Sequence, residues 1–330
     1  MGNNIPKISV IIPNYNGAAY LGACLDSLAS QSEKDFETIL VDNGSTDNSV
    51  ALAQNHPHKP KIIKLEKNHG FSGAVNRGIE QARADLIAVF NNDAVADERW
   101  LSRLAECSAQ RKDMDFFASL VLRMDNREII ESAGVGYSIQ ARPQAIFEDE
   151  LFSGKVAGME VFLASGAAML VRKNLFEKVG KLDEDYFAYL EDVDLFLRAR
   201  LAGFKGMLAE GAIAYHRGAS TVLGDNPGPK RMESKQRVSL ISRNRWYLIW
   251  DNLPASLIIL FSPFIFWGWM RGFFYHLLKS GQIKAFLSGS WTGFLSFPSR
   301  LQKRRTVKKL RKINLSEFVS WMWRGCKELR

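Results

Sequence analysis

Cysteine is scarce in this chain, and two common phosphate-binding loops are absent. The 330 residues include three cysteines, Cys24, Cys107 and Cys326, which are too widely spaced for a zinc motif and odd in number for a disulfide framework. Such usage fits a reducing compartment. No Walker loop is present, and no G-x-G-x-x-G follows an apolar run. These absences argue against P-loop NTPases and dinucleotide-binding Rossmann domains.

Targeting signals and acidic residues are missing from particular stretches. Met1 to Lys7 has no apolar segment, and Pro6 stands where a myristoylation motif needs Ser or Thr. We therefore expect neither a secretory signal nor lipidation. The stretch from Arg300 to Ile313 holds eight basic residues and no acid, although the whole chain carries a net charge of only +9. This basic block indicates an anionic partner.

Short apolar runs alternate with helical patterns in the first third of the chain. The expected strands are Lys7–Pro13, Phe36–Val41, Lys61–Leu65 and Leu86–Phe90. The expected helices between them are Ala18–Gln31, Val50–Gln54 and Ala74–Ala84. Strands that alternate with helices predict an α/β fold, with a mostly parallel central sheet and helices on both faces.

A polar loop follows each of these four strands. The loops are Pro13–Asn16, Asp42–Ser45, Asn68–Gly73 and Asn91–Asp93. In open α/β sheets, ligands bind outside the carboxyl ends of the strands. We therefore predict that the four loops converge on one pocket.

Each motif in these loops also has a plain structural explanation. Asp42-Asn43-Gly44-Ser45 can contact a base or ribose, or can be an ordinary turn. Asn91-Asn92-Asp93 can hold a divalent cation together with a diphosphate, or can cap a helix that begins near Asp97. His216, at the end of another expected strand, can complete a metal site with Asp93 or can be structural.

A second acidic motif lies at residues 190–194. Glu191, Asp192 and Asp194 follow an apolar, aromatic run and precede apolar residues at helical spacing. Acids in the first turn of a helix are stabilised by the helix dipole. Three acids behind an aromatic run also suit a carboxylate at the mouth of a pocket, where it can act as a general base.

The chain changes character near Asn226–Pro229, a strong turn signal. We predict an α/β core over residues 1–225 and a helical region over residues 226–330. Leu253–Met270 is uncharged but contains Pro254 and Pro263. The helical region can therefore contain a membrane span, lie as helices in the bilayer interface, or pack on the core as a helical subdomain. We favour the interface, with Arg300–Lys312 against anionic lipid. We expect no nucleic acid, because no known binding module is present.

Seven segments, taken in order, resemble the inverting family 2 glycosyltransferases, which have the GT-A fold. Within that family they are most similar to bacterial rhamnosyltransferase-like enzymes of surface polysaccharide assembly. The segments are Val10–Asn16, Val41–Asp47, Asn68–Gly78, Asn91–Asp93, Gly166–Arg172, Tyr189–Asp194 and His216–Thr221. Any one of them is a weak signal, but seven in the family's order are a strong one.

The resemblance implies a role for each matching residue. Nucleotide-sugar contacts would come from Pro13, Tyr15, Asp42, Asn43, Gly70, Asn76 and Asn92. Asp93 and His216 would hold a divalent cation, Mg²⁺ or Mn²⁺. Asp192 would be the catalytic base, and Glu191 and Asp194 would orient it, raise its pKa or contact the acceptor. Asn91 departs from the family, because many relatives have Asp there.

The implied activity is transfer of a sugar, with inversion, from a nucleoside-diphosphate sugar such as dTDP-rhamnose or a UDP-hexose. The acceptor would be a lipid-linked glycan or a polysaccharide in cell-surface glycan synthesis, at the inner face of the cell membrane. One alternative is a nucleotide-sugar-binding protein without transferase activity. Another is a nucleotidyltransferase, which would normally have a Gly-rich basic loop where Asn14–Gly17 stands.

Overall fold

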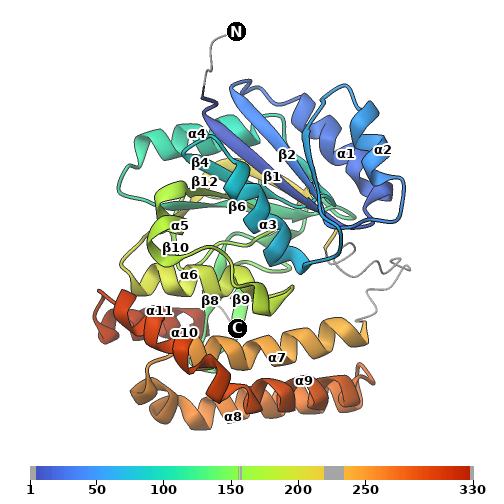
Figure 1. The fold of residues 1–330 in the computed structure, drawn as a ribbon. Coiled ribbons are helices and arrows are strands. Elements are labelled where there is room, and N and C mark those ends of the chain that lie inside the picture. The colour runs from blue at the N-terminus through green and yellow to red at the C-terminus, as the bar shows by residue number, and fades with distance from the viewer. Residues whose placement is uncertain (1–4, 155, 157, 219–233, 328–330) are drawn as a thin grey trace.

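The computed structural model describes residues 5–154, 156, 158–218 and 234–327. A large twisted sheet with helices on both faces forms the upper part of the molecule, and a set of long helices lies beneath it (Figure 1). The predicted α/β fold with a helical C-terminal region is therefore confirmed. The predicted domain boundary at residues 225/226 lies outside the described residues.

The central sheet has the strand order β10-β12-β6-β11-β4-β1-β2-β3. Its strands are β1 Ile8–Asn14, β2 Phe36–Asp42, β3 Lys61–Lys64, β4 Leu86–Phe90, β6 Phe116–Arg123, β10 Glu160–Val161, β11 Ala168–Arg172 and β12 Gly206–His216. The strands β4, β1, β2 and β3 are mutually parallel, as predicted. β11 runs antiparallel between β4 and β6.

Four shorter strands border the sheet: β5 Ala94–Ala96, β7 Ile130–Ser132, β8 Val135–Tyr137 and β9 Pro143–Ala145. β5 pairs with β12 and β7 with β6, whereas β8 and β9 form a hairpin of their own. The hairpin lies in the stretch from 126 to 158, which has little helical or strand periodicity.

Helices cover both faces of the sheet. They are α1 Ala18–Ala29, α2 Ser49–Asn55, α3 Gly70–Gln81, α4 Trp100–Gln110, α5 Lys173–Val179, α6 Glu191–Leu201 and the short 3-10 helix η1 Glu184–Tyr186. The side chains of β1 alternate between two cores: Val10 and Ile12 pack on the side of α1 and α4, and Ile11 on the side of α3. Burial on both faces explains why β1 reads as one continuous apolar run.

Five helices form the C-terminal region: α7 Lys235–Asn252, α8 Ala255–Leu278, α9 Ile283–Leu295, α10 Phe297–Leu310 and α11 Leu315–Lys327. α8 continues through Pro263, and Pro254 is its N-cap. Among the described residues, α8 is the one helix long and apolar enough to cross a membrane. α8 and α9 lie at the bottom of the molecule in Figure 1.

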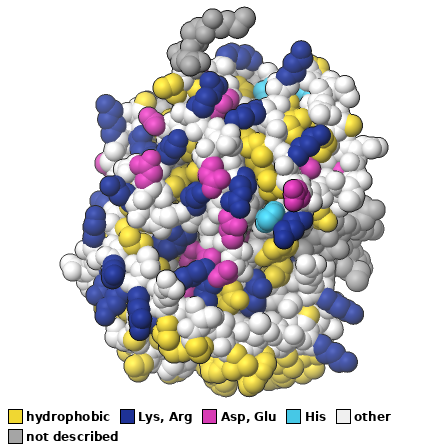
Figure 2. Space-filling view, viewed as in Figure 1, with side chains coloured by type: hydrophobic (Ala, Val, Ile, Leu, Met, Phe, Trp, Pro, Cys, Tyr) yellow, Lys and Arg dark blue, Asp and Glu magenta, His cyan; other side chains and the backbone are white. Residues whose placement is uncertain are grey.

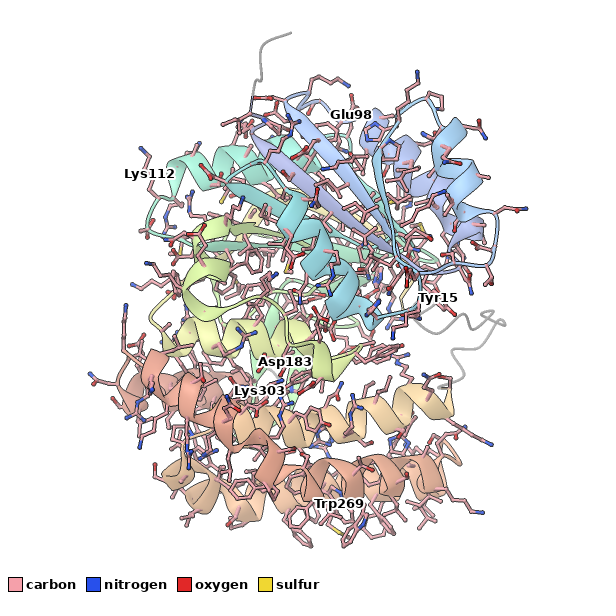
Figure 3. The ribbon with its side chains drawn as sticks, viewed as in Figure 1. Tyr15, Glu98, Lys112, Asp183, Trp269 and Lys303 are labelled. Atoms are coloured by element: carbon pink, nitrogen blue, oxygen red, sulfur yellow. The ribbon has the colours of Figure 1, made fainter. Side chains whose placement is uncertain are left out.

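Buried ion pairs join the C-terminal helices to the core. Arg300 of α10 bonds Asp183 at 2.7 Å and Asp185 at 2.8 Å, and also pairs with Asp251 of α7. Figure 3 shows Lys303 beside Asp183, with which it also pairs. Arg300 is only 2% exposed, so the prediction that it faces lipid is wrong for this residue. Its role is to hold α10 against the segment that leads to η1.

Candidate active site

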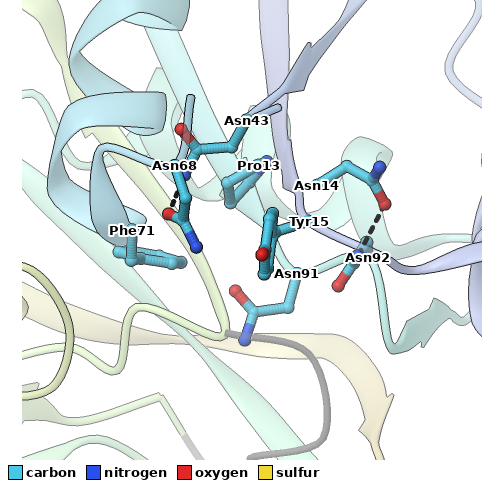
Figure 4. Close-up of a pocket in the computed structure, with 8 residues that line it drawn as sticks. All are labelled: Pro13, Asn14, Tyr15, Asn43, Asn68, Phe71, Asn91 and Asn92. Atoms are coloured by element: carbon cyan, nitrogen blue, oxygen red, sulfur yellow. Dashed lines mark hydrogen bonds between the residues drawn. The ribbon is translucent and has the colours of Figure 1, made fainter. Parts of the chain in front are cut away.

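A small pocket lies where the parallel strands end (Figure 4). It is lined by residues from all four predicted loops: Pro13, Asn14, Tyr15, Asn43, Asn68, Phe71, Asn91 and Asn92. Side-chain amides cross-link the loops, since Asn43 donates to Asn68 at 2.9 Å and Asn92 donates to Asn14 at 2.8 Å. The predicted convergence of the loops is confirmed. Pro13, Tyr15, Asn43 and Asn92 are thereby brought together.

Asp42, Asn76 and Gly70 are also expected nucleotide contacts, but they do not line the small pocket. Asp42 accepts a hydrogen bond from the Asn14 side chain at 3.1 Å and one from the Ser45 amide at 3.3 Å, so the ordinary turn is present. Asn76 donates to the Leu182 carbonyl at 2.9 Å and accepts from the Leu182 amide at 3.1 Å. Contact of either residue with a nucleotide stays a prediction.

Gly70 is the third of these residues, and it lies directly against the loop that precedes α6. Its φ of +75° is one that side chains rarely adopt, and a Cβ there would collide with the Phe187 carbonyl. Only glycine therefore allows α3 to begin so close to that loop. Gly70 sets the separation between the small pocket and the acidic motif.

A larger cavity of about 590 Å³ opens next to the small pocket. The two share Phe71 and Asn91 as lining residues. The larger cavity is also lined by acidic and basic residues from distant parts of the chain: Asp93, Glu131, Arg142, Glu148, Glu191, Asp192, His216, Arg237 and Arg271. The predicted base and the predicted metal ligands thus face one space.

Asp93 and His216 meet at one end of this cavity. Nε2 of His216 lies 3.2 Å from Oδ1 of Asp93, and Nδ1 lies 2.8 Å from Oε1 of Glu131. Both nitrogens therefore face carboxylates. Burial alone would lower the pKa of His216, but the charges of Asp93 and Glu131 outweigh burial and raise the pKa to about 10.

Asn91 completes this group of polar side chains. Its Nδ2 lies 3.1 Å from Nε2 of His216, and its Oδ1 is buried without a hydrogen-bond partner among the described residues. Neither Asn91 nor Asp93 caps a helix, because the chain continues from them into β5 and α4 has Arg99 as its N-cap. The alternative of a helix cap is therefore excluded for Asp93.

The donor set at this end of the cavity fits a hard divalent cation. A carboxylate and an amide oxygen suit Mg²⁺ or Mn²⁺. His216 would add an imidazole nitrogen only in its deprotonated form, so binding of a cation through it would release a proton. Among the described residues, no group of three or more His, Cys, Asp and Glu side chains is arranged to hold a metal by itself. That also fits Mg²⁺, which keeps several waters and takes ligands from phosphates. Glu131, which contacts Nδ1 of His216, would orient the imidazole ring toward the cation.

Asp192 lines the same cavity as Asn91 and lies at the start of α6. Its Oδ2 accepts a hydrogen bond from the Gly166 amide at 2.8 Å, and its Oδ1 accepts one from the Val193 amide at 2.8 Å. The N-cap itself is Leu190, which makes no side-chain cap. Burial raises the pKa of Asp192, although the amides of Gly166 and Val193 oppose this. A fixed, partly exposed carboxylate with a raised pKa is suited to accept a proton.

Glu191 and Asp194 flank Asp192 but have different surroundings. Burial, and after it the charge of Asp192, raises the pKa of Glu191 well above its ordinary value. Glu191 lines the cavity. Asp194 instead forms a buried ion pair with Arg198 at 2.9 Å and accepts from the Asn252 side chain at 2.8 Å. Asp194 thus ties α6 to α7, and its expected orienting role stays a prediction.

The loop before Asp192 is strained and is held by α7. Phe187, Tyr189 and Leu190 all have positive φ, between 64° and 71°, which costs about 1–3 kcal/mol for each non-glycine residue. The side-chain amide of Asn244 donates to the carbonyls of Tyr186, Ala188 and Tyr189, at 3.0, 2.9 and 2.7 Å. Asn244 therefore fixes the conformation that brings Asp192 into the cavity.

The sequence did not identify Glu131 or Asn244 as site residues. Glu131 lies in β7, within a stretch that has little periodicity, and its only signal is alternation with the buried Ile130 and Ser132. Asn244 lies in α7 among many polar residues. Nothing in its spacing separates it from an asparagine exposed to solvent.

Comparisons with known proteins identify a family, related sequences and a similar fold. The model of the Glycosyl transferase family 2 matches residues 9–180. The Bacillus subtilis protein described as uncharacterized glycosyltransferase EpsJ is 29% identical over 216 residues, which cover 64% of this chain and 61% of that protein. A Rickettsia typhi relative, uncharacterized glycosyltransferase RT0329, is 27% identical over 58% of each chain. The chain thus spans about three fifths of the length of these relatives.

A solved structure has a similar fold. The mannosyltransferase PcManGT of Pyrobaculum calidifontis, in complex with GDP-Man and Mn²⁺, superposes with a TM-score of 0.53 at 14% identity, covering 97% of this chain and 88% of that one. At this identity the likeness shows the fold alone. The family model covers more than half of this chain and includes Asp42, Asn91 and Asp93. This chain therefore belongs to glycosyl transferase family 2.

Proposed function

We propose that this protein is an inverting glycosyltransferase that moves a sugar from a nucleoside-diphosphate sugar to a lipid-linked or polysaccharide acceptor. The observation that carries the proposal is the shared cavity. Asp192, held by the Gly166 amide, faces the same space as Asp93 and His216. A base on one side and a site for diphosphate on the other are the two parts that sugar transfer needs.

The small pocket would receive the nucleoside. Tyr15 and Phe71 offer aromatic surfaces there, and Asn43 and Asn68 offer amides (Figure 4). The diphosphate would then extend past Asn91, which borders both cavities. A thymidine or uridine donor, such as dTDP-rhamnose or a UDP-hexose, follows from the resemblance of the sequence motifs to rhamnosyltransferase-like enzymes.

The proposed reaction is a single displacement. The acceptor hydroxyl oxygen forms a bond to the anomeric carbon while the bond from that carbon to the diphosphate oxygen breaks. Asp192 takes the hydroxyl proton, and the nucleoside diphosphate leaves with the bonding electrons. A divalent cation held by Asp93 and His216, when bound, would neutralise charge on the departing diphosphate. Attack from the face opposite the leaving group inverts the anomeric centre.

We also propose that the protein binds the inner face of the cell membrane through α8 and α9. Exposed apolar side chains gather there: Ile259, Leu260, Phe264, Phe266, Trp267, Phe274, Leu278, Trp291, Phe294 and Leu295. Figure 2 shows this patch at the bottom of the molecule. Arg305, Lys308, Lys309, Arg311 and Lys312 are exposed as well and can meet anionic headgroups. A patch of this kind marks a membrane or partner surface.

Donor binding and release test the proposal. We expect a panel of nucleotide sugars to raise the Tm only for the correct donor, and more strongly with Mn²⁺ or Mg²⁺. Asp93→Ala should abolish the metal-dependent part of the shift. Glu98→Gln is the matched control, because Glu98 is exposed and lies away from Tyr15 in Figure 3.

The second part of the test separates transfer from binding. Acceptor-dependent release of nucleoside diphosphate is expected of a glycosyltransferase. A protein that binds the donor without this release would instead be a nucleotide-sugar-binding protein. Equal donor affinity with and without metal would contradict the proposed role of Asp93.

A further inference from the structure

A group of arginines lines the side of the catalytic cavity that faces α8. Arg142 precedes β9, and Arg271 lies on α8; both line the cavity that contains Asp192. Nη1 of Arg142 donates to the Gly268 carbonyl of α8 at 3.4 Å. Arg245 of α7 lies nearby, because its Nη1 is 3.9 Å from where a Cβ on Gly272 of α8 would lie. The three positive charges therefore meet where the cavity adjoins α8.

The same cavity is also lined by acids, including Glu148, Glu191 and Asp192, but in the described part of the chain these arginines are not paired with them. Among the described residues, Arg142, Arg245 and Arg271 form no ion pair, whereas Arg198, Arg200 and Arg300 each pair with a carboxylate. Nε of Arg245 is buried without a hydrogen-bond partner, and so is the hydroxyl of nearby Tyr137. Burial, and after it the charge of Arg142, lowers the pKa of Arg245 to about 9. Arg142 and Arg245 are partly buried and Arg271 is exposed at the rim; an unpaired guanidinium that is withdrawn from water is unfavourable unless an anion completes it.

The anion would not be the donor diphosphate of the proposed reaction. That group belongs beside Asp93 and His216, which lie with Asn91 at the border with the small pocket. The arginines share the cavity with Asp192 but come from α8 and from the turn before β9. α8 also carries the exposed apolar side chains Ile259, Leu260, Phe266 and Trp267. Arg271 thus lies on the helix that carries the proposed membrane surface, and Arg142 is bonded to the same helix.

We propose that Arg142 and Arg271, supported by Arg245, bind a phosphate or diphosphate that links the acceptor's sugar to its lipid. This inference rests on the proposed function and narrows its acceptor to a lipid-phosphate-linked glycan. Guanidinium groups bind phosphate oxygens through paired, charge-assisted hydrogen bonds. With the phosphate held there, the lipid extends along α8 toward the bilayer and the sugar extends toward Asp192.

Binding of a short lipid diphosphate tests the site without any sugar transfer. The probes are farnesyl diphosphate, farnesol and inorganic diphosphate, titrated calorimetrically into the full chain without donor. We expect farnesyl diphosphate to bind more tightly than either of the other two. Arg142→Gln with Arg271→Gln should raise its Kd by roughly tenfold or more, since hydrogen bonds to charged groups are lost. Lys279→Gln, an exposed basic residue just after α8, should leave the Kd unchanged.

Two further measurements identify the anion's source. Binding of UDP or dTDP with Mn²⁺ should stay normal in the double variant, and neither nucleotide should displace farnesyl diphosphate. Displacement by nucleotide, equal binding of farnesol, or a Kd unaffected by the double variant would each overturn the inference. The single variant Arg271→Gln, at an exposed position, repeats the test if the double variant has a lowered Tm. Normal probe binding in a protein that never transfers sugar would contradict the proposed function and leave this site supported.

Discussion

The side-chain amide of Asn244 lies 2.7 Å from the carbonyl oxygen of Tyr189, three residues before Asp192. Asn244 belongs to α7, so a C-terminal helix determines the conformation of the loop that presents the proposed base. Tyr189 and Leu190 both have positive φ, and such strain persists only where surrounding contacts hold it. The helical region therefore supports the proposed base as well as forming a proposed membrane contact.

Asn244→Ala tests this positioning role. The substitution removes the donor of the Ala188 and Tyr189 carbonyls, at a cost of about 1–3 kcal/mol for each group left unpaired. The Tyr186 carbonyl keeps its hydrogen bond from Arg243. We expect kcat to fall roughly 10- to 100-fold, because small displacements of a reacting group are costly, while the donor Kd changes little. Gln236→Ala, at an exposed position of the same helix, is the control. A lowered Tm with unchanged kcat would show that Asn244 is only structural.

Glu131→Gln tests the support of His216. The substitution keeps the shape of the side chain but removes the charge that lies 2.8 Å from Nδ1 of His216. Loss of a carboxylate that orients a metal-binding histidine weakens metal binding by roughly 10- to 100-fold. Calorimetric titration of Mn²⁺ in the presence of nucleoside diphosphate measures the change, with Glu128→Gln as an exposed control. An unchanged Mn²⁺ affinity would place the cation away from His216.

Trp267→Ser combined with Trp291→Ser tests the membrane surface. Both side chains are exposed, at 59% and 65%, and burying an aromatic side chain in lipid is worth about 1.5–3 kcal/mol. We expect the fraction that cosediments with anionic liposomes to fall at least tenfold. Leu151→Ser, equally exposed but far from this patch in sequence, should bind as the wild type does. Wild-type protein that stays in the supernatant would contradict the proposal.

Removal of residues from 253 onward is a less specific test than these point variants. It would delete Arg300, whose carboxylate partners include the buried Asp251 and Asp183. Breaking a buried pair by removing one partner costs about 3–5 kcal/mol. A soluble but inactive truncated protein could therefore reflect a disordered η1 segment rather than loss of lipid contact.

The pH profile of kcat tests which carboxylate titrates. Burial raises the pKa of Asp192, and the base must be deprotonated to act. The rate should therefore fall as the pH falls through this pKa, beginning at a higher pH than for an ordinary aspartate of pKa about 3.9. Glu191→Gln should keep this acid limb. Disappearance of the limb in Glu191→Gln would assign the titration to Glu191.

Local sequence patterns predicted the half of the sheet that holds the small pocket. The polar loops follow β1 to β4, which are neighbouring parallel strands, so their carboxyl ends meet at one edge of the sheet. The antiparallel β11 was not predicted as such, because a short apolar run such as Ala168–Arg172 has the same pattern in either direction. Its direction matters, since β11 follows Gly166, whose amide holds Asp192.

The rest of the site depends on contacts between segments far apart in the chain. Glu131 reaches His216 across 85 residues and Asn244 reaches Tyr189 across 55. Neither contact has a periodic signature. For Arg300 the sequence predicted a lipid contact that the structure does not have. In the sequence it is one of eight basic residues in a block, and only its tertiary contacts show that it is buried against Asp251.

The steady-state turnover of Asp192→Asn tests the central claim most directly. Asparagine keeps the shape of the side chain but cannot take a proton, and general-base catalysis contributes roughly 10²- to 10⁴-fold. The measurement is acceptor-dependent release of nucleoside diphosphate, with the Tm and the donor Kd of the same variant as controls. We predict that kcat falls at least 10²-fold while Tm and donor Kd stay near those of the wild type. A folded Asp192→Asn protein that binds donor and keeps most of its turnover would contradict the account.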